Sequence, residues 1–301
     1  MKRAIVVVVI VMCLVSLVAF AEDATKVPKY IWVQNVTVAG DKAESYRGLV
    51  GQYRRAVDTV KSDSYWITAS SLTGDLRQLT FVSFYNSMAA AEKDFADPAI
   101  SAEVKRVNPN FWTETGAAEL EPRGSVAVYR EDLSFQPGKV PPPEVKWWRI
   151  KTIHVKPGYR TAFADLMKEE IELLNNAKVD EHFAVYEVIA GVPTTGQVYY
   201  IVTQMKSLGE MDADYSEQMK PFVTPVIREH LEAVVQKIVT RVEDNLLMVR
   251  PDLSRAPQAF LAANPVFWTI KEPETVAAKG KAKAKKPAKE AESIPPKLDK
   301  N

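Results

Sequence analysis

The chain has 301 residues, enough for two domains, and 47% of them are hydrophobic against 26% charged. This balance is typical of globular proteins and excludes a wholly disordered chain. The formal net charge is +1, but basic residues at both ends leave the body, residues 22–278, net acidic, which argues against a nucleic-acid-binding surface there.

Residues 1–21 have the pattern of an export signal peptide. Lys2 and Arg3 precede an apolar run from Ala4 to Phe20, and Ala19 and Ala21 are the small residues that a signal peptidase requires. We therefore predict an exported bacterial protein, periplasmic or extracellular, with an uncleaved membrane anchor as the alternative. The only cysteine, Cys13, lies in this segment, so the mature chain would have no disulfide and no thiolate ligand.

Residues 22–136 predict a first α+β repeat, because β-branched stretches alternate with apolar residues at helical spacing. The expected elements are, in chain order, a strand from Trp32 to a turn at Gly40, a helix over 46–60, strands at 64–70 and 79–85, a helix broken near Pro98, and a closing strand.

A proline-rich linker, residues 137–143, precedes a second repeat over residues 144–256 with the same element order. Its expected elements are a strand from Trp148 to a turn at Gly158, a helix over 163–174, strands at 182–188 and 198–204, a helix from about Thr224 to Val242, and a closing strand. Both repeats end in a shared signature, since Arg130-Glu131-Asp132-Leu133-Ser134 and Arg250-Pro251-Asp252-Leu253-Ser254 differ at one position. We therefore predict that the body of the chain is a tandem duplication of one structural unit.

A β-α-β-β-α-β unit forms a four-stranded antiparallel sheet with both helices on one face. The bare face needs cover, which a second such sheet supplies. We therefore predict an α+β fold in which two tandem ferredoxin-like repeats pack sheet to sheet as a barrel within one chain. A single chain can close its own barrel, so the sequence allows either a monomer or a homodimer.

The element order and the strand that ends in Val155-Lys156-Pro157-Gly158 resemble the dimeric α+β barrel superfamily, most closely its NIPSNAP-like and antibiotic-biosynthesis-monooxygenase-like domains. The resemblance covers about residues 29–255, and the first repeat departs from the turn with Ala39-Gly40. That superfamily includes haem-binding enzymes, cofactor-free oxygenases and members without known activity. The resemblance therefore implies a fold and leaves the chemistry open.

Candidate ligand-binding residues lie in the second repeat. Arg149 and Lys151 share one strand face and could bind a carboxylate or a haem propionate, or form a solvated strand end beside Glu170 or Glu187. Tyr186 and Tyr199 belong to an aromatic-rich set that could line a cleft for an apolar planar ligand or fill the core. The other members of this set are Trp147, Trp148 and Tyr200.

The three histidines show no metal-ligand spacing, and no metal is predicted. His230 lies on the apolar stripe of the long helix, so we expect a partly buried imidazole that is either a haem ligand or a hydrogen-bonded residue at the edge of the core. His154 is expected to face the barrel interior or its rim, and His182 to be exposed. No phosphate-binding loop or nucleophile elbow occurs, and no catalytic residue is predicted.

The C-terminal part changes in character. Residues 257–276 are apolar enough to dock on the body at a place that the sequence does not locate, and residues 277–301 form a Lys/Ala/Pro-rich tail that we expect to be disordered. The tail could contact anionic lipid or cell-wall polymer, or serve only as a solubilising tether. The lysines concerned are Lys279, Lys281, Lys283, Lys285, Lys286 and Lys289.

The leading hypothesis is an exported tandem α+β barrel protein that binds a small apolar or aromatic molecule. One alternative is a haem-using or cofactor-free oxygenase-like enzyme with its site in the second repeat. The other is a cell-envelope interaction module that acts through the basic tail.

Overall fold

The computed structural model describes residues 27–192 and 196–270, and the described residues up to Thr269 belong to one compact unit. The predicted export signal and the predicted basic tail lie outside the described residues. Within the described ranges no helix has the length and apolar character needed to cross a membrane.

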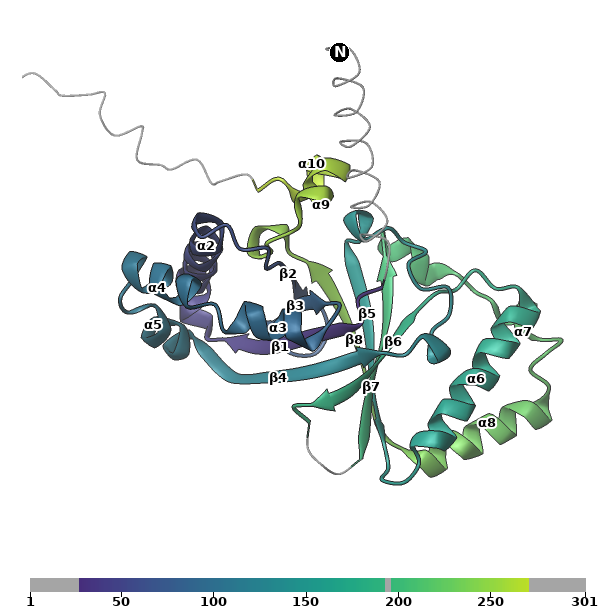
Figure 1. Ribbon diagram of the computed structural model, residues 1–301. Coiled ribbons are helices and arrows are strands. Elements are labelled where there is room, and N and C mark those ends of the chain that lie inside the picture. The colour runs from purple at the N-terminus through teal and green to yellow at the C-terminus, as the bar shows by residue number, and fades with distance from the viewer. Residues whose placement is uncertain (1–26, 193–195, 271–301) are drawn as a thin grey trace, which may run out of the picture. The chain divides into compact units, whose positions relative to one another are not determined.

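Eight antiparallel strands of the described residues close into a barrel in the order β1-β3-β2-β8-β5-β7-β6-β4 (Figure 1). Counted within its own repeat, each set of four has the strand order 4-1-3-2 of a ferredoxin-like unit, which confirms the predicted fold class. The strands are β1 (Tyr30–Val38), β2 (Trp66–Ser71), β3 (Gln78–Tyr85), β4 (Glu119–Tyr129), β5 (Trp147–Val155), β6 (Ala184–Ala190), β7 (Gln197–Met205) and β8 (Val239–Val249).

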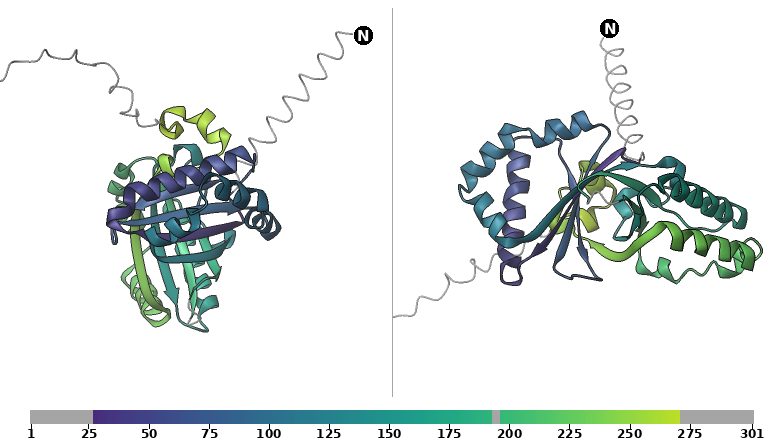
Figure 2. Two further views of the ribbon diagram at one scale, coloured as in Figure 1. Left: turned by 90° about the vertical axis from the view of Figure 1, so that its left-hand side faces the viewer. Right: turned by 90° about the horizontal axis from the view of Figure 1, so that it is seen from below.

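The helices of each repeat cover the outer face of their own sheet, on opposite sides of the barrel (Figure 2). The first repeat contributes α2 (Ala43–Thr59), α3 (Met88–Phe95), α4 (Pro98–Val107) and α5 (Phe111–Ala118), and the second α6 (Arg160–Ala177), α7 (Ser216–Met219) and α8 (Pro225–Ile238). The chain also forms α9 (Gln258–Ala263), α10 (Pro265–Trp268) and the 3-10 turns η1 (Gly40–Lys42), η2 (Glu131–Leu133), η3 (Pro142–Glu144), η4 (Leu208–Asp212) and η5 (Pro251–Leu253).

The last helix of the second repeat is shorter than the sequence predicts. It ends at Ile238 instead of Val242, and β8 begins at the next residue. The segment after Ile238 contains the β-branched residues Val239, Thr240 and Val242, which favour a strand, and it pairs with β5. A helix that leads directly into the closing strand also occurs in the first repeat, where α5 ends at Ala118.

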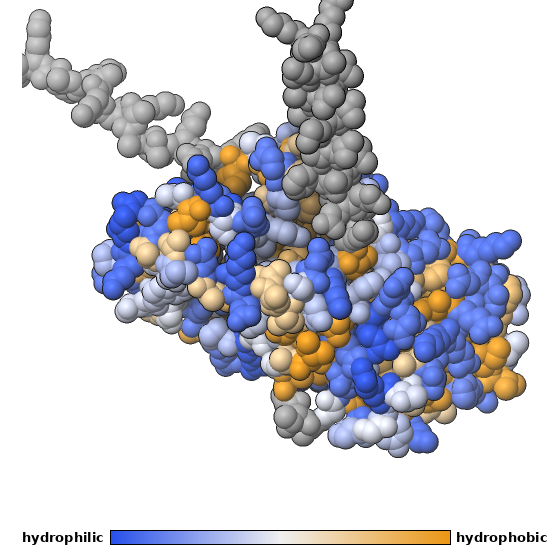
Figure 3. All heavy atoms as spheres, viewed as in Figure 1, coloured by the Kyte–Doolittle hydropathy of each residue, from blue (hydrophilic) through white to orange (hydrophobic). Residues whose placement is uncertain are grey.

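Between each sheet and its helices lies a packed apolar layer. In the second repeat this layer includes Phe163 and Met167 of α6, Tyr199 of β7 and Ile238 of α8, which are all buried. In the first repeat Leu49 of α2 is part of the corresponding layer. On the face shown in Figure 3, hydrophilic residues prevail and hydrophobic ones form separate patches, as expected for amphipathic helices that bury one stripe.

The two sheets are joined edge to edge at two hydrogen-bonded ladders. β4 of the first repeat pairs with β6 of the second, and β8 of the second pairs with β2 of the first. A free-standing ferredoxin-like sheet would expose two unpaired edges, which closure into a barrel removes.

The shared signature extends the first of these junctions. The segment Arg130–Ser134, which we name the first closure segment, follows β4 and crosses to β6 of the other repeat. The backbone N–H of Arg130 donates to the carbonyl oxygen of Val185 at 2.8 Å, and the N–H of Val185 donates to Oγ of Ser134 at 2.9 Å. Ser134 Oγ in turn donates to the carbonyl oxygen of Arg130 at 2.7 Å.

The segment Arg250–Ser254, the second closure segment, makes the corresponding hydrogen bonds from the second repeat to β2 of the first. Arg250 N–H donates to the carbonyl oxygen of Thr68 at 2.7 Å, Thr68 N–H donates to Ser254 Oγ at 2.9 Å, and Ser254 Oγ donates to the carbonyl oxygen of Arg250 at 2.7 Å. The duplicated sequence therefore performs one task twice: it ties the closing strand of each repeat to the second strand of the other.

Replacing Ser134 or Ser254 with Ala should lower the free energy of unfolding by about 1–3 kcal/mol each, because a buried N–H would lose its acceptor. Urea denaturation followed by circular dichroism measures this change. Ser101→Ala, at an exposed position of α4, is the matched control and should change the free energy by no more than about 0.5 kcal/mol. Equal effects at all three positions would contradict the role given to the closure segments.

Candidate functional site

The barrel interior contains a cavity of about 680 Å³. Inward-facing residues of all the barrel strands line it, because alternate residues of a strand point to opposite faces of a sheet. A volume of this size lies within the usual range for sites that enclose a small molecule.

One end of the cavity, which we name the capped end, lies where β1 and β5 begin. Apolar and aromatic side chains line it there, together with Phe260 of α9 and Trp268 of α10. Trp268 is buried, its Nε1 donates to the carbonyl oxygen of Pro143 at 2.9 Å, and Asn264 Nδ2 donates to the same oxygen at 3.2 Å. Residues 257–269 of the apolar C-terminal segment, whose docking place the sequence did not locate, thus cover this end of the barrel (Figure 1). The strand residues that line this end include Ile31, Ile67, Val82, Phe84, Trp148, Val202, Leu247 and Val249.

The opposite end, the polar end, lies where β1 and β5 finish. Asn35 Oδ1 accepts hydrogen bonds from Thr80 Oγ1 at 2.7 Å and from Gln78 Nε2 at 3.1 Å. The hydroxyls of Ser125 and Tyr200 are hydrogen-bonded at 2.9 Å. The further polar residues that line this end are Asp75, Arg123, Thr152, His154, Glu243 and Asn245. The cavity is therefore apolar toward the cap and polar toward the other end.

An imidazole and a carboxylate lie side by side at the polar end. His154 Nε2 is 3.4 Å from Glu243 Oε1, an ion-pair distance, although no hydrogen bond from this nitrogen is found within the described residues. Glu243 Oε1 also lies 3.0 Å from Nε of Arg241. The placement of His154 in the interior agrees with the sequence expectation, and its ring nitrogen can donate to or accept from a bound group.

Two tyrosines of the cavity, Tyr186 and Tyr200, stay neutral near physiological pH. Burial raises the pKa of the Tyr186 phenol above its usual range. Burial also raises the pKa of Tyr200, against a smaller lowering by its hydrogen bond to Ser125. Both therefore offer uncharged hydroxyl groups to the cavity.

Of the five candidate residues from the sequence, Tyr186 lines the cavity. Arg149 and Lys151 lie on the other face of β5, and the Arg149 guanidinium forms a two-pronged ion pair with Asp244, with Nε–Oδ1 and Nη2–Oδ2 distances of 3.0 and 2.6 Å. Tyr199 is fully buried beneath α6, where its ring stacks on Phe163 with centroids 4.3 Å apart. The structure therefore does not bring these candidates together.

Two histidines differ from expectation. The His230 side chain is 58% exposed, with Nε2 3.6 Å from Glu169 Oε2, so the expected partial burial is wrong. Its helix turns this position away from the sheet, although the apolar stripe passes close by. His182 is buried instead of exposed, and its Nε2 lies 2.6 Å from the carbonyl oxygen of Gln204.

The haem suggested by the superfamily resemblance does not fit the residues considered for it. A haem needs an axial ligand beside an apolar cavity, whereas His230 is exposed and the layer beneath α6 and α8 is filled by side chains such as Phe163 and Tyr199. We therefore derive no step through a haem. Within the described ranges, no group of three or more His, Cys, Asp or Glu side chains could hold a metal ion.

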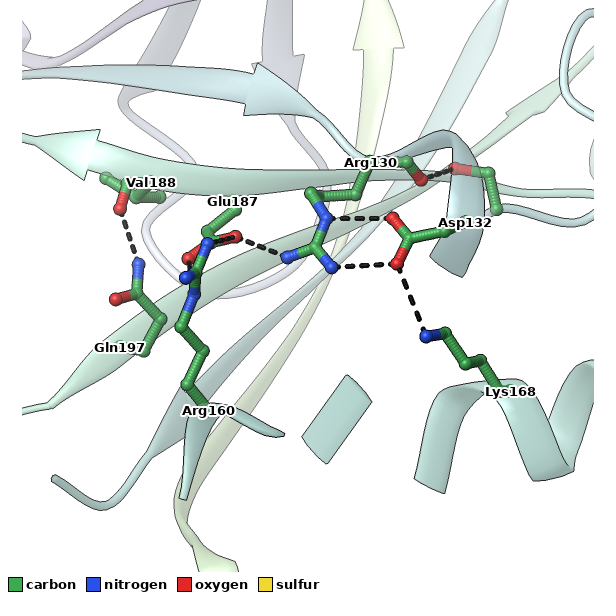
Figure 4. Close-up of polar contacts among 8 residues, drawn as sticks. Arg130, Asp132, Arg160, Lys168, Glu187, Val188 and Gln197 are labelled. Atoms are coloured by element: carbon green, nitrogen blue, oxygen red, sulfur yellow. Dashed lines mark hydrogen bonds and ion pairs between the residues drawn. The ribbon is translucent and has the colours of Figure 1, made fainter. Parts of the chain in front are cut away.

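An ion-pair cluster around the buried Glu187 lies on the outer face of β6 (Figure 4). The Glu187 side chain is only 4% exposed, and it accepts hydrogen bonds from Arg130 Nη1 at 2.5 Å and from Arg160 Nε at 2.6 Å. Arg130 also pairs with Asp132, which lies 3.7 Å from Lys168 Nζ. The cluster thus joins the first closure segment to β6 and α6, and we assign it a structural role.

The pKa of Glu187 reflects two opposing effects. Burial is the largest single effect and raises it, but the hydrogen bonds and positive charges of Arg160 and Arg130 together outweigh burial and hold the pKa below its usual value. A carboxylate whose pKa is lowered by folding stabilises the native state above the pKa of the unfolded chain.

No protein-family model matches the chain, and no curated protein does. Several solved structures are similar to it. An anthrone oxidase-like protein is 16% identical, with 75% of this chain and 93% of that chain covered and a TM-score of 0.49. A candidate monooxygenase from Lactobacillus acidophilus NCFM is 10% identical, with coverages of 76% and 97% and a TM-score of 0.44. Chlorite dismutase from Candidatus Nitrospira defluvii is 11% identical, with coverages of 81% and 98% and a TM-score of 0.43.

At these identities the likeness concerns the fold alone. The strand order of the barrel is that of two ferredoxin-like units, which is the architecture that the resemblance to the dimeric α+β barrel superfamily implies. The finer resemblance to NIPSNAP-like domains stays a prediction.

Glu187→Gln should lower the free energy of unfolding at pH 7 by about 1–2 kcal/mol, because it weakens the charge-assisted hydrogen bonds from Arg130 and from Arg160, which is itself largely exposed. The folded-state pKa of Glu187 is lowered, so this contribution is complete above the unfolded pKa of about 4.3 and is lost as the pH falls through the folded value. The difference between wild type and variant should therefore shrink in acid. Urea denaturation between pH 3 and pH 7 tests this, with Glu172→Gln at an exposed position of α6 as the control. A difference that does not depend on pH would refute the assignment.

Hemin titration followed by absorption spectroscopy checks the exclusion of His230 as a haem ligand. Any change in the Soret band should be the same in wild type and in His230→Ala, because this imidazole is exposed on the outer side of α8. A Soret shift that disappears only in His230→Ala would restore the haem-protein hypothesis.

Proposed function

We propose that the protein binds a small apolar or aromatic molecule inside the barrel. The observation that carries this proposal is the cavity of about 680 Å³, with a wall of aliphatic and aromatic side chains and one end covered by α9 and α10. Transfer of apolar surface from water into such a cavity is favourable without any specific contact. The polar end then orients the molecule.

An oxygenase-like reaction is the alternative that the superfamily resemblance suggests, and it would take place in the same cavity. One group there that could accept a proton from a bound molecule is His154, whose Nε2 has no hydrogen-bond partner within the described residues. The fold alone does not favour such a reaction over simple binding.

The other two parts of the sequence hypothesis stay predictions. Export rests on residues 1–21, and contact of the lysine-rich tail with an anionic envelope rests on residues 277–301. Both lie outside the described residues.

The apolar dye N-phenyl-1-naphthylamine should bind the purified protein with increased fluorescence, and Val202→Trp should weaken this binding at least about tenfold by filling the cavity. Val202 lines the cavity, whereas Val242 is exposed on the outer side of β8, so Val242→Trp is the matched control and should bind like wild type. Circular dichroism establishes that both variants fold. Binding that is unchanged in Val202→Trp would place the dye elsewhere and refute the proposal.

A further inference from the structure

The charged side chains that line the cavity already have partners. Among the described lining residues, each carboxylate or guanidinium forms an ion pair with a residue that does not line the cavity. The pairs are Asp75 with Arg77 at 3.3 Å, Arg123 with Glu121 at 3.1 Å, and Glu243 with Arg241 at 3.0 Å. A charged group that is removed from water inside the cavity would therefore meet no unpaired opposite charge, which costs free energy.

Three side chains at the polar end, by contrast, have hydrogen-bonding groups without a hydrogen-bond partner. Within the described ranges, no hydrogen bond is found for the side chains of Thr152 and Asn245 or for Nε2 of His154, although this nitrogen lies 3.4 Å from Glu243 Oε1. Thr152 lies opposite Glu243 in the ladder of β5 and β8, and Asn245 is the next inward-facing residue of β8. These three groups, which we name the head site, thus occupy neighbouring positions on two paired strands.

The apolar wall begins directly beside the head site on the same two strands. Ile150 is opposite Asn245, and Trp148 is opposite Leu247, one inward position nearer the cap each time. A molecule that matches both parts has a polar group at the head site and a largely apolar body that extends toward Trp148, whose indole Nε1 also has no hydrogen-bond partner within the described residues.

We propose that the ligand is a neutral amphiphile, with an uncharged hydroxyl or amide group at the head site and an apolar or aromatic body directed to the capped end. This inference rests on the proposed binding function and narrows it to a ligand class. Thr152, His154 and Asn245 act as hydrogen-bond partners, and the ion-paired residues around them disfavour charged analogues.

Four probes that share a naphthalene body test the proposal in competition with N-phenyl-1-naphthylamine. They are 1-methylnaphthalene, 1-naphthalenemethanol, 1-naphthoate and 1-naphthylmethylammonium. The neutral alcohol should bind at least about tenfold more tightly than the anion and the cation, because only the charged probes carry an uncompensated desolvation cost. An anion or cation that binds as tightly as the alcohol would overturn the neutral-ligand proposal.

Thr152→Val combined with Asn245→Leu removes the hydrogen bonds while keeping similar volumes. This variant should bind the alcohol about tenfold more weakly than wild type and bind 1-methylnaphthalene within about twofold of wild type. Thr203→Val, on the outer face of β7, is the control and should change neither affinity. Thr152→Val alone should show the same selective loss at smaller size, which keeps the test decisive if the double variant does not fold.

The outcomes separate the two proposals. Equal weakening of all four probes in the Thr152 and Asn245 variants would overturn the head site while leaving the binding function intact. Failure of wild-type protein to bind both the dye and 1-methylnaphthalene would refute the binding function itself.

Discussion

The exchange of backbone hydrogen bonds at the two closure segments is the constraint on which the rest of the molecule depends. Each ferredoxin-like repeat has a sheet with two edges and one face that its own helices do not cover. Arg130–Ser134 bonds to Val185, and Arg250–Ser254 bonds to Thr68, so each repeat satisfies an edge of the other. Unpaired strand edges leave backbone N–H and C=O groups without partners and promote aggregation, and closure into a barrel removes such edges. The interior in which a ligand could bind exists only because both junctions form.

Closure of the barrel also decides where a cavity can exist. The space between the second sheet and its helices is filled by Phe163, Tyr199 and their neighbours, whereas the space between the two sheets stays partly open. Because β1 and β5 begin at the same end of the barrel, the linker at Pro143 and the C-terminal helices meet there and cover it. The opposite end carries most of the polar side chains, so the lining of the cavity changes from mainly apolar at the capped end to mainly polar at the other end.

The candidate site was only partly accessible from the sequence. Alternation along β5 correctly placed His154 on the face opposite Ile153. Tyr186 of the aromatic-rich second repeat lines the cavity, and its part in ligand binding stays a prediction. Thr152 and Asn245 were missed because single polar residues on separate strands form no motif. A usable signal did exist, since each follows or precedes an apolar inward position of its strand, Ile150 for Thr152 and Leu247 for Asn245. Arg149 was chosen for its charge, and its partner Asp244 is known only from the pairing of β5 with β8.

The sequence by itself determined the duplication, the order of strands and helices, and which residues alternate along each strand. These features follow from local periodicity and turn residues, and a repeat can be recognised without knowing its contacts. Only the tertiary structure decided which sheet edges join, where residues 257–268 dock, that Glu187 lies between Arg130 and Arg160, and that His230 faces outward. These outcomes depend on contacts between residues far apart in the chain. Local sequence patterns do not show which of these contacts is most favourable.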